Sequence, residues 1–176
     1  MARDHARIRL DIWVDEDFVA LPSTSQWLYI RLLTSGELSY CGVADWRPGR
    51  IAASAVDLTA ADVEMFAQPL EDGHFIITDR ATEEVLVRSF VKHDGLMDKW
   101  NLAAAMAREF TAIASQPIRG VVAHELGRLK ADRPDYRGWT RPDVKKVLRR
   151  VAIAPADALR MTLPNPSESP KERGTE

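Results

Sequence analysis

The chain has one cysteine, Cys41, and no long apolar segment. A single cysteine excludes an internal disulfide framework and a zinc site built from several cysteines. No run approaches the ~20 apolar residues that cross a bilayer, and no charged-then-apolar leader stands at its beginning. We therefore expect a cytoplasmic protein that does not bind membranes and that buries Cys41 as a small hydrophobic residue.

The common catalytic patterns are absent too. The sequence contains no Gly-x-x-x-x-Gly-Lys-Ser/Thr phosphate loop, no Gly-x-Ser-x-Gly turn and no Gly-x-Gly-x-x-Gly motif. The four histidines lie far apart, without cysteines or carboxylates at metal-ligand spacing. Carboxylate pairs such as Asp15 and Asp17 fall in expected turns, where solvation is the simpler interpretation. We predict a non-enzymatic protein without a cofactor or metal.

The charged residues are unevenly distributed along the chain. The 176 residues are 45% hydrophobic and 28% charged, as in a soluble globular protein, with a net charge of −2. Residues 1–96 carry 9 Lys and Arg against 16 Asp and Glu, whereas residues 97–160 carry 13 against 7. Any binding to a polyanion should therefore depend on the basic back half.

Residues 47–90 contain the order helix, turn, helix, strand, turn, strand, which is typical of a winged helix-turn-helix. The first helix is expected at 48–56, with a proline at its start. The second begins after Thr59, a typical N-cap, and ends at Gly73. Its apolar stripe consists of Val63, Phe66, Ala67 and Leu70.

Two β-rich runs follow the second helix. They span 74–78 and 84–90, and the polar residues 79–83 between them predict a hairpin, followed by a loop at 91–95. A short strand at 42–46 precedes the two helices. A helix pair followed by such a ribbon commonly presents its second helix to DNA.

The segment before this unit is predicted to add one strand and one or two helices. Residues 7–13 alternate apolar and polar, which indicates a strand that joins the sheet. Residues 15–21 predict a short helix that Pro22 ends. Ser23 or Ser25 should cap a largely buried helix, the first of the winged domain.

The back half is predicted to be helical. One helix is expected from about 98 to 114, and Ser115 should cap another that runs to about 131. The apolar stripe of the second consists of Ile118, Val121, Val122, Leu126 and Leu129. This stripe is expected to pack on the rest of the chain or on a second copy, so a homodimer is plausible. Residues 132–139 contain proline and glycine without periodicity, which predicts a linker.

A strongly basic helix is expected next, at the start of the region 140–163. Thr140 should cap it, with Asp143 at the capping-box position. Its apolar arc consists of Val144, Val147, Leu148 and Val151, and its basic arc of Lys145, Lys146, Arg149 and Arg150. A short helix should follow, and residues 164–176 have the composition of a disordered tail.

The candidate DNA contacts are basic or polar groups around the two helices, the hairpin and the basic arc. They are Arg47, Arg50, Thr59, Gln68, Arg80, Lys92, Lys145, Lys146, Arg149 and Arg150. On the outward face of the second helix only Gln68 suits base reading, and Asp62 and Glu64 beside it would repel phosphate. The basic arc favours nucleic acid, with the acidic front half or simple solvation as alternatives. Trp100, Tyr136 and Trp139 either stack on bases or anchor loops.

Parts of the sequence resemble a known family. The strings SYCGV at 39–43 and VRSFVKH at 87–93 are its specific parts. Over residues 7–129 the chain resembles the small helix-turn-helix proteins of actinobacterial phages and prophages. These are similar in outline to the winged N-terminal domains of phage replication-initiation proteins. The resemblance implies DNA binding in the host cytoplasm, in replication initiation or transcriptional control.

We therefore expect an α+β fold, with a winged helix-turn-helix domain at 1–96 and a helical extension at 97–131. The expected function is non-enzymatic binding of double-stranded DNA. The alternative is a protein-interaction adaptor whose acidic winged domain binds a host or phage protein, for example one that acts in replication.

Overall fold

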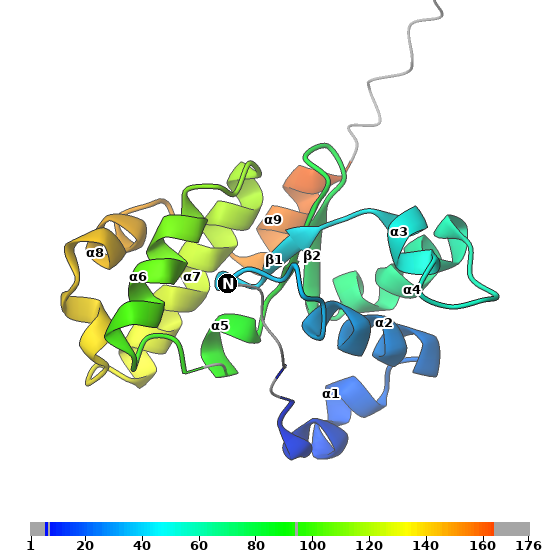
Figure 1. Ribbon diagram of the computed structural model, residues 1–176, viewed down its shortest axis with the longest axis horizontal. Coiled ribbons are helices and arrows are strands. Elements are labelled where there is room, and N and C mark those ends of the chain that lie inside the picture. Colours follow the sequence, from blue (N-terminus) through cyan, green and yellow to red (C-terminus); the bar gives the residue numbers. More distant parts are fainter. Residues whose placement is uncertain (1–5, 7, 94, 164–176) are drawn as a thin grey trace, which may run out of the picture.

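The computed structural model describes residues 6, 8–93 and 95–163. Among these residues the fold is mixed α and β, as predicted, with a small antiparallel sheet between two groups of helices (Figure 1). The tail predicted to be disordered, 164–176, lies outside the described residues. None of the helices in the described part of the chain is both long and apolar enough to cross a bilayer.

The front unit, residues 23–87, contains the elements predicted for a winged helix-turn-helix. The three strands are antiparallel in the order β1-β3-β2, and Leu86 of β3 lies opposite both Val43 and Ile77. This arrangement is compatible with a winged helix. The elements are α2 (Ser23–Leu33), β1 (Val43–Asp45), α3 (Pro48–Ala52), α4 (Ala60–Asp72), β2 (Ile76–Asp79) and β3 (Glu84–Val87).

The helices of the back unit follow the hairpin. They pack on one another and on the face of the sheet opposite to α2, α3 and α4 (Figure 1). They are α5 (Phe90–His93), α6 (Trp100–Phe110), α7 (Gln116–Asp132), the 3₁₀ turn η2 (Arg137–Thr140), α8 (Pro142–Leu148) and α9 (Pro155–Thr162).

Two of the predicted helix caps are confirmed. The Thr59 hydroxyl accepts a hydrogen bond from the Asp62 amide at 3.2 Å, and the Asp62 carboxylate accepts one from the Thr59 amide at 2.8 Å. Ser115 caps α7 by accepting from the Ile118 amide at 3.1 Å. These reciprocal bonds satisfy amides that the first turn of a helix leaves unpaired.

Other caps were predicted wrongly. The Ser25 hydroxyl donates instead to the Phe66 carbonyl at 2.8 Å, which joins α2 to α4. Thr140 lies in η2 and donates to the Arg137 carbonyl, because α8 begins only at Pro142. Asp143 pairs with Arg141 at 2.8 Å rather than closing a capping box.

The N-terminal segment does not form the predicted strand. Residues Leu10–Val14 form the 3₁₀ turn η1, and α1 (Glu16–Val19) follows. Arg9 pairs with Asp11 at 2.6 Å, and the Asp15 carboxylate caps α1. Such local bonds compete with a sheet ladder, and the alternating pattern does not correspond to a buried face, since Leu10 is 88% exposed.

Several elements are shorter than predicted, among them α6, which spans Trp100–Phe110 rather than about 98–114. Helix α3 ends at Ala52 rather than at 56. Strand β3 ends at Val87, whose amide donates to the Gly42 carbonyl, and the chain then turns into α5 instead of continuing as strand and loop. Helix α8 ends at Leu148, so Val151 lies outside its apolar arc and is 81% exposed.

The sheet is buried on both faces. Ile76, Val85 and Val87 pack against α2, α3 and α4, whereas Ile77 and Leu86 pack against α6 and α7. Successive side chains of a strand point to opposite faces, so the hairpin supplies both cores. Cys41 is fully buried in the core between the sheet and helices α6 and α7, as predicted.

Residues 132–139 are packed more closely than the linker prediction implied. Trp139 is buried, and its indole nitrogen donates to the Arg133 carbonyl at 2.7 Å. The Gly138 amide donates to the Met97 carbonyl at 2.9 Å. This close contact fixes the segment on the start of α6.

Gly138 should not tolerate even one added methyl group. A Cβ there would lie 2.7 Å from the Met97 carbonyl oxygen and 2.8 Å from the Ala103 Cβ, two atoms with little freedom to move. We expect Gly138→Ala to lower the free energy of unfolding by about 1–3 kcal/mol, measured by urea denaturation.

Gly127→Ala is the matched control for this prediction. Gly127 is exposed in α7, and an added Cβ would meet nothing within 4 Å. An alanine there should raise stability by about 0.5–1 kcal/mol, because glycine is costly in a helix interior. Equal effects of the two substitutions would contradict the packing argument.

Candidate nucleic-acid interface

Two arginines expected to contact phosphate are paired with carboxylates of the front unit. Arg47 lies 3.3 Å from Asp45 and 3.5 Å from Glu83, and Arg50 lies 3.2 Å from Glu37. All these groups are exposed, so each pair contributes little to stability. The pairing nevertheless offsets the positive potential that a phosphate would encounter.

Arg80 is not a free group at the tip of the hairpin. Its guanidinium lies 2.6 Å from Glu64 and 3.1 Å from Glu71, both on α4. The Thr78 hydroxyl also donates to Glu71, and the Trp46 indole donates to Glu64 at 3.1 Å. This polar network holds the hairpin against α4, an arrangement that the sequence reasoning missed. The only signal in the sequence was the spacing of the two glutamates, two helical turns apart on α4.

The outward face of α4 offers no cation. Gln68 is exposed, as predicted, but its amide donates to Asp72 at 2.9 Å. Thr59 is engaged in the helix cap with Asp62. Met65 is 62% exposed between these polar groups. The helix expected to read bases therefore presents carboxylates and a thioether.

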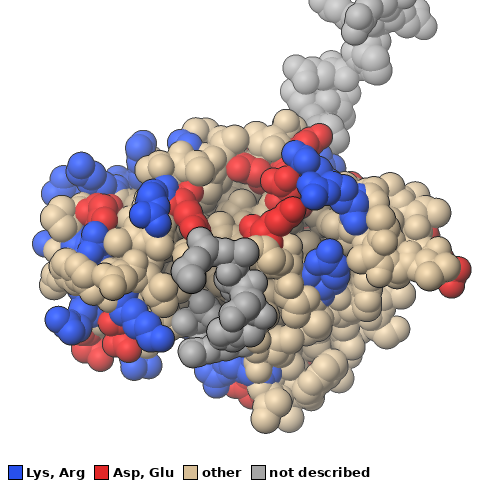
Figure 2. All heavy atoms as spheres, viewed as in Figure 1, with Lys and Arg blue, Asp and Glu red and all other residues tan. Residues whose placement is uncertain are grey.

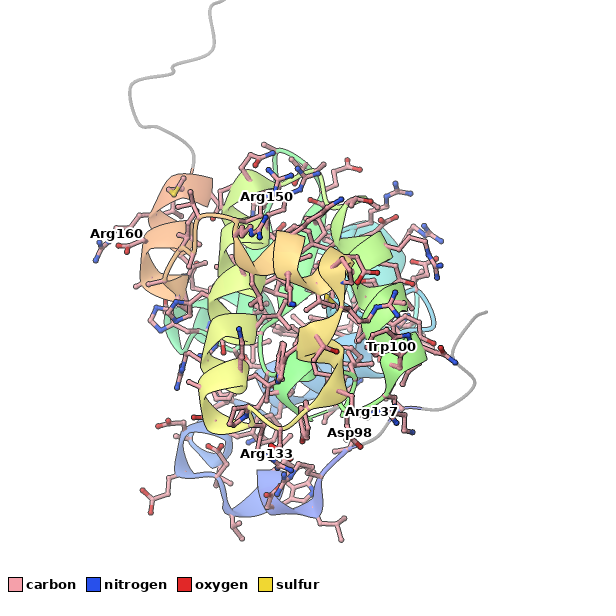
Figure 3. All side chains as sticks on the ribbon, turned by 90° about the vertical axis from the view of Figure 1, so that its left-hand side faces the viewer. Asp98, Trp100, Arg133, Arg137, Arg150 and Arg160 are labelled. Carbon is pink, nitrogen blue, oxygen red and sulfur yellow. The ribbon has the colours of Figure 1, made fainter. Side chains whose placement is uncertain are left out.

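The four residues of the predicted basic arc form a different kind of surface, here named the α8 basic face. Its members are Lys145, Lys146, Arg149 and Arg150. All four are exposed, and none forms an ion pair within the described ranges. Buried Val144 and Val147 fix the helix on α6 and α7. Figure 3 shows this side of the molecule, with Arg150 at one end of the face.

Two further cations of the back unit lie over aromatic rings. Arg141 stacks on Trp100, with the guanidinium carbon 4.6 Å from the ring centroid, and Arg133 lies similarly over Tyr136 at 4.7 Å. Both are also paired with carboxylates, Arg141 with Asp143 at 2.8 Å and Arg133 with Asp135 at 3.8 Å. Figure 2 shows Lys and Arg prevailing over α6–α8, whereas basic and acidic groups intermix near β1 and the hairpin. The uneven distribution of charge along the sequence thus gives an uneven distribution of charge on the surface.

For three aromatic residues, Trp100, Tyr136 and Trp139, the sequence allowed either base stacking or burial as loop anchors, and the structure shows different environments for them. Trp139 is a buried anchor, and Tyr136 is half-buried. Trp100 is 44% exposed beside Arg141, so one face of the back unit combines an aromatic ring with cations. Aromatic rings beside cations suit nucleotide stacking.

Lys92 lies apart from the α8 basic face. It is exposed on α5 and lines a cavity with residues of η1, α2 and α7. In the described part of the chain, no three His, Cys, Asp or Glu residues form a group that could hold a metal ion.

In comparisons with known proteins, no family model, no curated protein and no solved structure matches the chain. What the chain does must therefore be argued from its own residues.

Glu71 should make stability depend on pH. Its side chain is 7% exposed, and burial raises the pKa above the ordinary 4.5, although Arg80 partly offsets the shift. The folded state thus holds this proton more tightly than the unfolded state. Its contribution to stability is present below the ordinary value and is lost as pH rises through the raised pKa.

Glu71→Gln removes this titration and keeps the side-chain shape. The free energy of unfolding of the wild type, minus that of Glu71→Gln, should fall as pH rises above the ordinary pKa of 4.5 in urea titrations. Glu16→Gln, at an exposed position of α1, is the control. A difference that stays constant or rises with pH would contradict the assignment.

Proposed function

We propose that the front unit is a winged helix-turn-helix domain and that the protein binds double-stranded DNA without catalysing a reaction. The observation that carries the proposal is the contrast between two sets of cations. Arg47, Arg50 and Arg80 of the front unit face carboxylates at 2.6–3.5 Å, whereas the four residues of the α8 basic face have no such partner among the described residues.

Lys145 and Lys146 lie on α8, whereas Arg149 and Arg150 follow its end at Leu148, so the predicted basic arc is only partly helical. Four like charges within six residues repel one another, and a polyanion relieves that repulsion. The buried Val144 and Val147 anchor α8, which carries Lys145 and Lys146 and leads directly into Arg149 and Arg150. Phosphate contacts from such a surface supply affinity without reading sequence. We therefore assign affinity to the α8 basic face, and only a secondary role to the front unit.

A second candidate function is that of a protein-interaction adaptor. The exposed Met65 among the carboxylates of α4 favours it, because phosphate would be repelled there while an apolar or basic protein surface would not. Replication initiation or transcriptional control would accommodate either activity. A host or phage replication protein would be the partner of an adaptor.

A homodimer would need a surface other than the one expected from the sequence. The apolar stripe of α7 is buried within the same chain. A second copy therefore cannot bind through this stripe unless the core opens.

Neutralising the α8 basic face should abolish most DNA affinity. The variant replaces Lys145, Lys146, Arg149 and Arg150 by Gln, and the control replaces the ion-paired Arg47 and Arg50 by Gln. Anisotropy of a labelled random duplex should show at least about tenfold weaker binding at low salt for the first variant. The dependence of log Kd on log salt should become shallower by about 3–4 for that variant.

The control should bind within about twofold of the wild type. Equal losses in both variants would overturn the assignment to the α8 basic face. Wild-type protein that does not bind at low salt would reject the DNA proposal and favour the adaptor. Whole-chain variants are preferable to a truncation, because α8 and α9 supply core residues such as Val144 and Ala158.

A further inference from the structure

The outward side of α4 is a helix surface that faces solvent, here named the α4 acidic face. The inward side of the helix is buried in the core of the front unit. On the outward side an exposed thioether lies among polar and charged groups, in the manner of an apolar interface centre with a polar rim. The members of the face are Asp62, Glu64, Met65, Gln68 and Asp72.

The α4 acidic face keeps its negative charge in spite of its hydrogen bonds. Helix α4 has four Asp and Glu residues and no Lys or Arg. Asp62 is bonded to Thr59 and Asp72 to Gln68, and these neutral partners leave both negative charges uncompensated. Within the described ranges, the ion pairs of α4 are those with Arg80, which serves Glu64 and Glu71 together. One cation thus offsets only part of the charge of the helix.

The α8 basic face has the opposite charge and also an exposed apolar neighbour. Val151 directly follows Arg149 and Arg150 and is as open to solvent as they are. The α4 acidic face therefore offers carboxylates beside a thioether, and the α8 basic face offers cations beside an aliphatic side chain. Surfaces of opposite charge steer each other into contact, and their apolar groups can then bury area together.

The two faces belong to opposite sides of the molecule. Helix α4 packs on one face of the sheet, whereas α8 packs on α6 and α7 behind the other face. In Figure 1 α8 lies at the left end of the long axis and α4 in the right-hand part. One chain therefore cannot bring its own two faces together, but two copies can.

We infer that the α4 acidic face binds the α8 basic face of a second copy of this chain, with Met65 beside Val151 of that copy. Two different faces meet, so the contact is head-to-tail and leaves one face free on each copy, from which association continues. A single helix face on each side is a small contact, below about 1,200 Å² in total, which is typical of weak association. The inference does not depend on DNA binding.

The test is sedimentation equilibrium of the full chain, without DNA, over a range of protein concentrations. At about 0.02 M salt we expect the weight-average mass to rise with concentration above that of the monomer. At about 0.5 M salt, where the Debye length falls below about 5 Å, the mass should return to that of the monomer. A chain that stays monomeric at low salt, or an association that salt does not weaken, would overturn the inference.

Two variants remove one face each. The α4 variant combines Met65→Gln with Asp72→Asn, both at exposed positions, and leaves the helix cap and the Arg80 pairs intact. The α8 variant replaces the four residues of the α8 basic face by Gln. Each variant alone should associate at least about tenfold more weakly than the wild type. An equimolar mixture should regain the wild-type affinity but stop at a dimer, because only one intact face of each kind remains.

Matched controls change charge elsewhere. Glu16→Gln with Asp17→Asn removes two carboxylates at exposed positions of α1, and Arg47→Gln with Arg50→Gln removes two ion-paired cations. Neither control should weaken association. If only the α8 variant lost association, another acidic surface would bind the basic face and the assignment to α4 would be wrong. A mixture of the α4 and α8 variants that stays monomeric would also contradict the head-to-tail contact.

Discussion

The β2–β3 hairpin is the constraint on which the rest of this structure depends. It has a core on each face, and alternate residues of its strands belong to opposite cores. The Glu84 carboxylate at its end also accepts hydrogen bonds from the Ala114 and Ser115 amides at 2.9 and 2.7 Å. The hairpin therefore joins the front and back units by packing and by hydrogen bonding, and neither unit is complete without it.

The hairpin joins the two units by packing, but their surface charges differ. In the front unit, carboxylates pair with Arg47, Arg50 and Arg80, and one of these carboxylates, Glu71, is buried behind Arg80. The four residues of the α8 basic face, two on α8 and two just after it, face solvent without such partners among the described residues. A helix-turn-helix order and a nucleic-acid surface therefore need not coincide in one molecule. Here the order belongs to the front unit, and the surface that we propose for DNA belongs to the back unit.

The sequence by itself determined the helices and strands of the front unit, the caps at Thr59 and Ser115, and the burial of Cys41, because local periodicity and capping chemistry act over a few residues. It also determined which half carries the excess of positive charge. Only the tertiary structure decided that residues 10–14 turn instead of joining the sheet and that Trp139 is an anchor. It also decided that Arg47, Arg50 and Arg80 face carboxylates, whereas the residues of the α8 basic face form no ion pair among the described residues. The carboxylates that pair with Arg50 and Arg80 are 9 to 16 residues away along the chain, and only folding brings them within the few ångströms over which such pairing acts.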